Sequence, residues 1–143
     1  YGAREFYKNT TSSMVIQLGY QILNGKAPRL FDGSDKILRD FVNIEDVIQA
    51  NIKACTPKQN GVYNVGTGEP RSFQDIADIL QKELGTNLGT KYFPNPYDGY
   101  QMHTQADISE SEKQLEYHPQ VTLEQGIKAY VPEIKRLFEE GVD

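Results

Sequence analysis

The sequence predicts an α/β fold, and three observations support that class. Segments with the apolar spacing of helices alternate along the chain with short runs rich in β-branched and aromatic residues, which favours mixed layers over an all-helical bundle. No internal repeat or low-complexity segment interrupts the alternation. The 143 residues, 38% of them hydrophobic, suffice for one domain with a real core but not for two full domains.

The first half of the chain is predicted to alternate between helices and strands. Apolar residues between Met14 and Leu23, followed by Asn24-Gly25 as a stop signal, predict the first helix. Asp32 to Asp35 is rich in turn-forming residues and should end the first strand. In order, we expect a helix at 11–25, strands at 29–31 and 38–44, a helix at about 45–56 ended by Pro57, and a strand at 62–65.

The second half of the chain contains three capping-box patterns, each a Ser or Thr followed three residues later by an acidic residue or Gln. Such a pair satisfies backbone donors at a helix start. The pairs are Ser72–Asp75, Ser109–Glu112 and Thr122–Gln125. We therefore expect helices at about 73–84, from 109, and at about 123–139, with a kink or break at Pro132, besides a strand at 90–93.

Composition and charge exclude several partners. The net charge is −5 and the basic residues are scattered, so nucleic acid and a membrane surface are not expected partners, whereas a small anion held by a few Arg or Lys is compatible with the sequence. No apolar run approaches the roughly 18 residues that span a bilayer. One cysteine, Cys55, allows no intrachain disulfide; it indicates a reducing compartment, and its helical pattern predicts a buried thiol.

Several local patterns carry possible chemistry. Gly66-Thr-Gly68 precedes a predicted helix, but Arg71 stands where a dinucleotide fingerprint needs its third glycine, so we interpret the segment as a tight turn. Arg39 beside Asp40 is compatible equally with a phosphate contact and with a structural ion pair. Lys8, taken alone, is a solvated lysine and a poor base. No metal site is predicted, because the histidines lack ligand spacing.

The loop at 94–108 combines aromatic and amide side chains, including Tyr97, Tyr100, Gln101 and His103. Loops of this kind on a rigid scaffold often contact ligands, although the pattern alone favours a purely connecting loop.

Several segments together resemble a known family. Tyr1-Gly-Ala-Arg4, Arg39-Asp-Phe-Val42 and Tyr63-Asn-Val-Gly-Thr-Gly68 resemble the later part of extended short-chain dehydrogenases/reductases that act on nucleotide sugars. Finer segments narrow the resemblance to the ADP-L-glycero-D-manno-heptose 6-epimerase family: Arg4-Glu-Phe-Tyr-Lys8, Leu30-Phe-Asp-Gly-Ser34, Tyr100-Gln101 and Thr104-Gln-Ala-Asp107. The resemblance covers nearly the whole chain and implies a C-terminal substrate-binding portion of a Rossmann-type enzyme.

The resemblance implies a reaction and a cofactor. Family members invert C6 of an ADP-heptose by transient oxidation with NADP, in the bacterial cytoplasm, for lipopolysaccharide, and the whole enzyme is expected to be a homo-oligomer. Because the chain opens at Tyr1 and contains no Tyr-x-x-x-Lys motif, we expect the N-terminal NADP-binding domain to be absent from residues 1–143 and this chain alone to be inactive.

The resemblance also implies roles for residues of this chain. Lys8 matches a catalytic acid/base. The implied substrate-binding residues are Thr10, Gln17, Phe31, Asp32, Gly33, Ser34, Arg39 and Tyr100, of which Arg39 would hold the diphosphate and Tyr100 would close over it. Ala3, Thr10, Gln17 and Asn43 depart from the usual family residues Pro, Ser, His and Tyr.

Two alternatives remain open at this point. The chain could belong to another NAD-dependent nucleotide-sugar 4-epimerase or 4,6-dehydratase branch. It could also be a stand-alone interaction module without catalytic activity.

Overall fold

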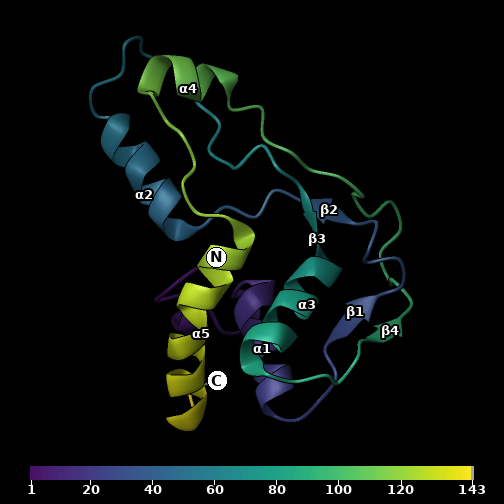
Figure 1. Ribbon diagram of the computed structural model, residues 1–143. Helices are drawn as coiled ribbons and strands as arrows, with labels where there is room; N and C mark the ends of the chain where they lie inside the picture. The colour runs from purple at the N-terminus through teal and green to yellow at the C-terminus, as the bar shows by residue number, and fades with distance from the viewer. Residues whose placement is uncertain (143) are drawn as a thin grey trace.

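The computed structural model describes residues 1–142 and contains both helices and short strands (Figure 1). In chain order the elements are the 3-10 segment η1 (Phe6–Thr11), α1 (Met14–Leu23), β1 (Arg29–Phe31), β2 (Leu38–Arg39), α2 (Ile44–Lys53), β3 (Arg71–Ser72), α3 (Phe73–Leu84), β4 (Lys91–Phe93), α4 (Ser109–Leu115) and α5 (Leu123–Glu139). The mixture confirms the predicted α/β class.

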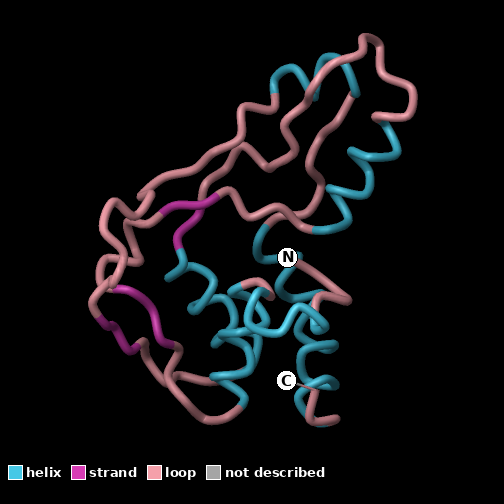
Figure 2. The backbone as a smooth tube through the Cα atoms, turned by 180° about the vertical axis from the view of Figure 1, so that it is seen from behind, coloured by secondary structure: helices cyan, strands magenta, loops and turns pink. Residues whose placement is uncertain are grey.

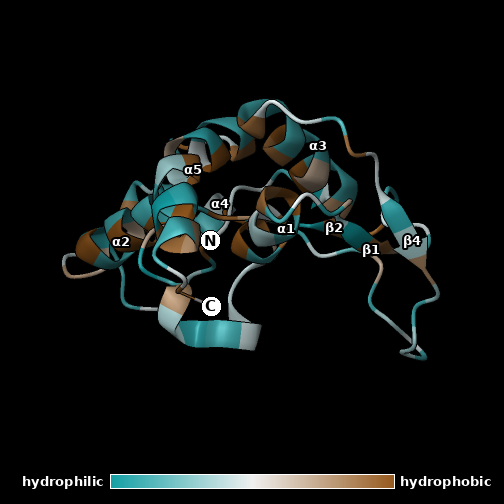
Figure 3. Cartoon of the chain, turned by 90° about the horizontal axis from the view of Figure 1, so that it is seen from below, coloured by the Kyte–Doolittle hydropathy of each residue, from teal (hydrophilic) through white to brown (hydrophobic). Residues whose placement is uncertain are grey.

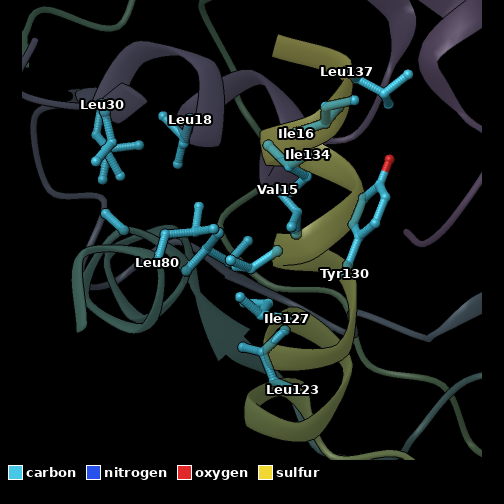
Figure 4. Close-up of a cluster of buried hydrophobic side chains, with 14 residues drawn as sticks. Val15, Ile16, Leu18, Leu30, Leu80, Leu123, Ile127, Tyr130, Ile134 and Leu137 are labelled. Carbon is cyan, nitrogen blue, oxygen red and sulfur yellow. The ribbon is translucent and has the colours of Figure 1, made fainter. Parts of the chain in front are cut away.

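The main core lies between α1, α3 and α5, which pack against one another in pairs. Leu18, Ile76, Leu80, Ile127 and Ile134 are fully buried there, and Figure 4 shows side chains from all three helices converging. Their spacing of three and four residues puts each set on one helical face, which is why the apolar pattern predicted the helices. These three helices therefore form the main body of the fold.

Two of the three predicted capping boxes are present. Ser72 Oγ accepts the N–H of Asp75 at 3.0 Å, and the Asp75 carboxylate accepts the N–H of Ser72 at 2.8 Å. Thr122 and Gln125 make the equivalent pair at the start of α5. Both helices therefore begin where the sequence placed them.

The strands form two small sheets beside the helical core (Figure 1). β1 pairs with β4 in parallel, with Phe31 opposite Phe93, and β2 pairs with β3 antiparallel, with Arg39 opposite Arg71. Beyond β4 the chain runs alongside β2 in parallel at His103. The Leu38 N–H donates to Met102 O at 2.8 Å, and Leu38 O accepts the Thr104 N–H at 3.0 Å. The loop at 94–108 is therefore attached to β2 by backbone hydrogen bonds.

A second, smaller hydrophobic cluster joins α2 to α4. Ala50, Leu115 and Tyr117 are buried in it, and Tyr63 and Val65 pack against them. Figures 1 and 2 show α2 and α4 side by side at one end of the molecule, away from α1, α3 and α5. The chain therefore has a main helical body and a smaller lobe.

Several predictions about local structure were wrong. The segment 62–65 is not a strand, and Val62 is 99% exposed. The strand expected at 38–44 stops at Arg39, and Asn43 instead caps α2 by accepting the N–H of Glu45 at 3.0 Å. β3 was not predicted. Each difference reflects a pairing or cap that local propensity does not encode.

Three further details differ from expectation. Ser109 is the first residue of α4 rather than its cap, and its N–H and hydroxyl both donate to Asp107. α5 continues as one helix through Pro132 instead of breaking. Cys55 is exposed just after α2 rather than buried within it.

Candidate functional site

An aromatic cluster joins the end of β1 to the loop that follows β4. The Phe31 ring lies edge-on to Phe93, Tyr97 and Tyr100, with centroid distances of 5.0, 6.1 and 5.6 Å. The Tyr97 and Tyr100 rings stack on each other at 6.3 Å. Phe31 and Tyr100, both predicted to contact substrate, are therefore neighbours although 69 positions separate them in the sequence. Flat aromatic faces of this kind can stack with a nucleotide base.

Arg39 lies between the rings of Phe73 and Tyr100. Its guanidinium carbon is 5.8 Å from the Phe73 centroid and 5.2 Å from that of Tyr100. The guanidinium donates to Leu38 O at 2.8 Å and to Gln101 O. Within residues 1–142 it forms no ion pair, so the possibility of an Arg39–Asp40 ion pair is wrong. Its positive charge is therefore not neutralised by a described carboxylate.

Asp40 connects three segments of the chain: the end of β2, residues 67–68 and Ala106. Its carboxylate accepts the amide N–H groups of Thr67, Gly68 and Ala106 at 2.7, 2.9 and 3.1 Å, and the Thr67 hydroxyl at 2.5 Å. Partial burial raises the pKa of this carboxyl, but the hydrogen bonds from Thr67, Gly68 and Ala106 outweigh it and leave the pKa below its ordinary value. Asp40 thereby fixes the strand end that carries Arg39.

A cavity of about 750 Å³ opens beside the aromatic cluster. That volume is within the range of small-molecule sites. Its lining includes Gln17, Phe31, Ser34 and Tyr100 among the predicted substrate residues. It also includes two cations that sequence reasoning missed.

Those two cations are Lys26 and Arg29, and neither forms an ion pair within the described chain. Arg29 lies over the Phe93 ring, with its guanidinium carbon 4.9 Å from the centroid. Lys26 lies three residues before the first predicted strand and Arg29 is its first residue, and no local pattern of the sequence marks either as a cavity residue. Together with Arg39 they make this side of the molecule suited to an anionic ligand.

The turn after β1 is closed by its own hydrogen bonds. Ser34 is 1% exposed, and its N–H, at 3.1 Å, and its hydroxyl both donate to Phe31 O. Gly33 has φ of +76°, a conformation that favours glycine. Asp32 is exposed, and its N–H donates to Phe93 O at 2.8 Å. Of these residues only Ser34 and Phe31 line the cavity, so Asp32 and Gly33 shape the turn.

Lys8 and Thr10 lie on the exposed 3-10 segment η1. Lys8 lines a different cavity, of about 680 Å³, together with Tyr7, Ile44 and Ile48. Thr10 lines a third, of about 410 Å³, which shares Gln17 with the aromatic cavity. The structure thus gathers Gln17, Phe31, Ser34 and Tyr100 around one cavity, and sets Lys8 in another.

The Gly66-Thr67-Gly68 turn does not fit the pyrophosphate of a dinucleotide. The amides of the Gly66-Thr67-Gly68 turn, where a pyrophosphate would bind, already donate to Asp40. A side chain at Gly66 would lie 2.5 Å from Ala106 Cβ and 2.6 Å from the Asp40 carboxylate, so the turn is filled. This confirms the interpretation of the segment as a tight turn. Among residues 1–142 no group of three His, Cys, Asp or Glu side chains could hold a metal ion.

One face of α2 exposes an apolar stripe. Ile44, Ile48 and Ile52, spaced four residues apart, are 36%, 43% and 57% exposed. Hydrophobic residues on α2 are visible at the edge of the molecule in Figure 3. Ile44 and Ile48 also line the Lys8 cavity. We call Ile44, Ile48 and Ile52 the α2 stripe.

The chain belongs to the GDP-mannose 4,6 dehydratase family, whose model matches residues 2–130. Among solved structures it is similar to the ADP-L-glycero-D-manno-heptose-6-epimerase of Helicobacter pylori, with 47% identity and a TM-score of 0.86. That match covers 94% of this chain and 41% of the epimerase, so the chain spans about two fifths of that protein's length.

Other similar structures act on other nucleotide sugars. The UDP-glucose 4-epimerase of Thermotoga maritima, solved with UDP-glucose, is 28% identical with a TM-score of 0.83, over 95% of this chain and 43% of that one. The UDP-glucuronic acid 4-epimerase of Bacillus cereus, solved with UDP-glucuronic acid and NAD, is 30% identical with a TM-score of 0.78, over 87% and 40%. These findings confirm the predicted resemblance to extended short-chain dehydrogenase/reductase epimerases. No helix of residues 1–142 has the length and apolar character needed to cross a membrane.

Proposed function

We propose that this chain is the C-terminal, substrate-binding portion of a nucleotide-sugar epimerase that inverts C6 of ADP-glycero-manno-heptose. The observation that carries the proposal is the cavity beside Phe31 and Tyr100, where aromatic faces adjoin cations free of ion pairs. Aromatic rings suit a purine base, and guanidinium groups suit a diphosphate. The 47% identity to a heptose epimerase favours ADP-heptose over other nucleotide sugars.

In this proposal the diphosphate lies near Arg39, Lys26 and Arg29, and Tyr100 closes over it. Gln17 and Thr10 contact the sugar side, since the cavities they line meet at Gln17. Asp32, Gly33 and Ser34 hold the turn that borders the nucleotide. Lys8 acts as one acid/base of the reaction, because inversion needs proton transfer on each face of the carbon.

The cofactor belongs to another part of the enzyme in this proposal. NADP supplies transient oxidation of the sugar carbon, and a separate N-terminal Rossmann domain binds it. This domain covers the α2 stripe, since exposed apolar surface of this kind needs a partner. Ile44 and Ile48 of the stripe also line the Lys8 cavity, so a domain packed there would bring its bound cofactor close to Lys8. The whole enzyme is then a cytoplasmic homo-oligomer, and this chain alone is inactive.

Ligand-observed NMR with ADP, UDP and dTDP tests the substrate class. We expect ADP to bind more tightly than UDP or dTDP, and Arg39→Ala to weaken ADP binding by roughly 1.5–3 kcal/mol, the scale of a lost charged hydrogen bond. Lys113→Ala, which removes an exposed lysine of α4, is the matched control and should leave binding unchanged. A preference for UDP or dTDP would instead favour the 4-epimerase branch represented by the Thermotoga and Bacillus structures.

A further inference from the structure

The segment that carries Lys8 and Thr10 contributes no buried side chain to the core. All residues of η1, Phe6–Thr11, are exposed, and none is buried. Asn9 within it has φ of +49°, so the segment does not continue as a regular helix. Exposed backbone with few buried contacts is the part of a protein that opens most easily. Something outside the segment must therefore hold it in place.

Glu5 meets that need from the start of the segment. Its side chain is buried, at 6% exposure, and both carboxylate oxygens contact Ser13. Oε2 accepts the Ser13 N–H at 2.9 Å, and Oε1 accepts the Ser13 hydroxyl at 2.6 Å. Ser13 is the residue immediately before α1. The carboxylate thus joins the two ends of residues 6–12 into a closed loop on the helix.

The surroundings of Glu5 are unusual for a carboxylate. Within residues 1–142 it forms no ion pair with a basic side chain. A buried carboxylate without a cation needs hydrogen-bond donors to offset its loss of hydration, and the N–H and hydroxyl of Ser13 are two such donors.

We propose that Glu5 is a positioning residue, which closes the loop of residues 6–12 onto the start of α1 and so fixes where Lys8 and Thr10 stand. The effect on catalysis rests on the proposed function, in which Lys8 transfers a proton. Gln17 holds the C-terminal part of the loop, since its side-chain amide donates to Ser12 O at 2.6 Å and to Thr10 O at 3.2 Å. Glu5 holds the N-terminal part of the loop, three residues before Lys8.

Three substitutions separate geometry from charge. Glu5→Ala removes both contacts with Ser13. Glu5→Gln preserves them, because the amide oxygen can accept the Ser13 N–H while the amide nitrogen donates to the Ser13 hydroxyl. Glu133→Ala is the matched control: its carboxylate accepts the Arg4 N–H at 2.9 Å, just outside the loop, so the loop ends stay joined.

The first measurement is limited trypsin digestion of the protein as its gene encodes it, with cleavage after Lys8 followed by mass spectrometry. We expect Glu5→Ala to accelerate cleavage after Lys8, and Glu5→Gln and Glu133→Ala to match the unsubstituted protein. Unchanged cleavage in Glu5→Ala overturns the loop closure. This readout needs no enzymatic activity, so it stands even if the protein proves not to be an epimerase.

The second measurement is epimerase kinetics of the same variants. We expect Glu5→Ala to lower kcat by roughly ten- to a hundredfold, the scale of a small misplacement of a catalytic group, with a smaller change in KM because Gln17 still holds Thr10 O. Glu5→Gln should recover most of kcat. Faster cleavage with unchanged kcat, or a lower kcat that Glu5→Gln fails to recover, overturns the positioning role. An unsubstituted protein without epimerase activity overturns the proposed function instead, and the digestion then decides the role of Glu5.

Discussion

Asp40 and Ala106, 66 positions apart in the chain, are joined by a hydrogen bond of 3.1 Å from the Ala106 N–H to Asp40 Oδ2. The same oxygen accepts the Gly68 N–H, so one carboxylate connects β2, the turn before α3 and the end of the loop at 94–108. The neighbouring Arg39 contacts Tyr100 and Gln101 earlier in that loop. The adjacent residues Arg39 and Asp40 therefore fix residues 100–106, one at each end of this part of the loop.

Replacing Asp40 should destabilise the fold. Asp40→Ala removes the acceptor for three amide groups, and we expect a loss of roughly 1.5–3 kcal/mol in the free energy of unfolding, the scale of hydrogen bonds to a charged group. Denaturant titration measures this. Asp35→Ala, on the exposed turn after β1, is the control and should change little. Equal stability of the two variants would contradict the role assigned to Asp40.

The depressed pKa of Asp40 also predicts a pH dependence. A carboxyl whose pKa is lower in the folded than in the unfolded protein stabilises the fold above its unfolded pKa, and the contribution is lost as the pH falls through the folded pKa. The unsubstituted protein should therefore lose more stability on acidification below about pH 4 than Asp40→Ala does. Parallel acid titrations of both proteins by circular dichroism would show the difference.

Tyr117 should make the fold sensitive to alkali. It is fully buried, its hydroxyl donates to Gly66 O at 2.8 Å, and burial raises its pKa to about 12. Because the folded pKa exceeds the unfolded value, the stabilisation is present at neutral pH and lost as the pH rises from about 10 towards 12. Absorbance of tyrosinate at high pH, followed together with unfolding, measures this.

Tyr117→Phe provides the matching substitution. It removes the hydrogen bond to Gly66 O, so the free energy of unfolding at neutral pH should fall by roughly 0.5–1.5 kcal/mol, and part of the alkaline loss should disappear. Tyr7→Phe is the control, because Tyr7 is 69% exposed. An alkaline profile that Tyr117→Phe leaves unchanged would assign the sensitivity to other tyrosines.

The α2 stripe predicts self-association of this chain in isolation. Ile48→Glu places a charge in the middle of the stripe and should reduce both the apparent mass in sedimentation and the binding of a hydrophobic dye. Gln49→Glu adds the same charge to an exposed position next along the helix and should reduce neither. A monomeric, non-dye-binding chain would count against a missing partner surface and favour a stand-alone module.

Lys8→Ala tests the acid/base role proposed for Lys8. We expect epimerisation to fall by roughly 10²–10⁴-fold, the usual contribution of general acid–base catalysis, while binding of the nucleotide sugar is largely kept. Lys36→Ala, which removes an exposed lysine from the turn after β1, should leave the rate unchanged. Full activity in Lys8→Ala would remove Lys8 from the mechanism.

Local patterns predicted the helices well, because a helix satisfies its own backbone. Phe73, Ile76 and Leu80 repeat with the helical period, and the capping pairs at Ser72 and Thr122 mark the starts, so α3 and α5 have the predicted bounds. The strands were predicted less well. Val62 to Val65 has strand-like residues, but a strand also needs a neighbour to pair with, and propensity alone does not provide one.

The candidate site was predicted in part, and the resemblance supplied most of it. Phe31 and Tyr100 do lie together, whereas nothing local revealed that Lys26 and Arg29 line the same cavity. Asp40 was considered only as a partner for Arg39, since the N–H groups that donate to its carboxylate come from segments 27 and 66 positions away. Contacts at such separations depend on the finished fold rather than on neighbouring residues.

The division of the interior into two hydrophobic clusters predicts how the protein unfolds locally. The body of α1, α3 and α5 contains many fully buried side chains, whereas the lobe of α2 and α4 is held mainly by Ala50, Leu115 and Tyr117. Amide protons of the lobe should therefore exchange with solvent deuterium through partial openings that leave the helical body intact. The α2 stripe lies on this lobe, so a covering partner would slow that exchange and merge the two units into one cooperative transition.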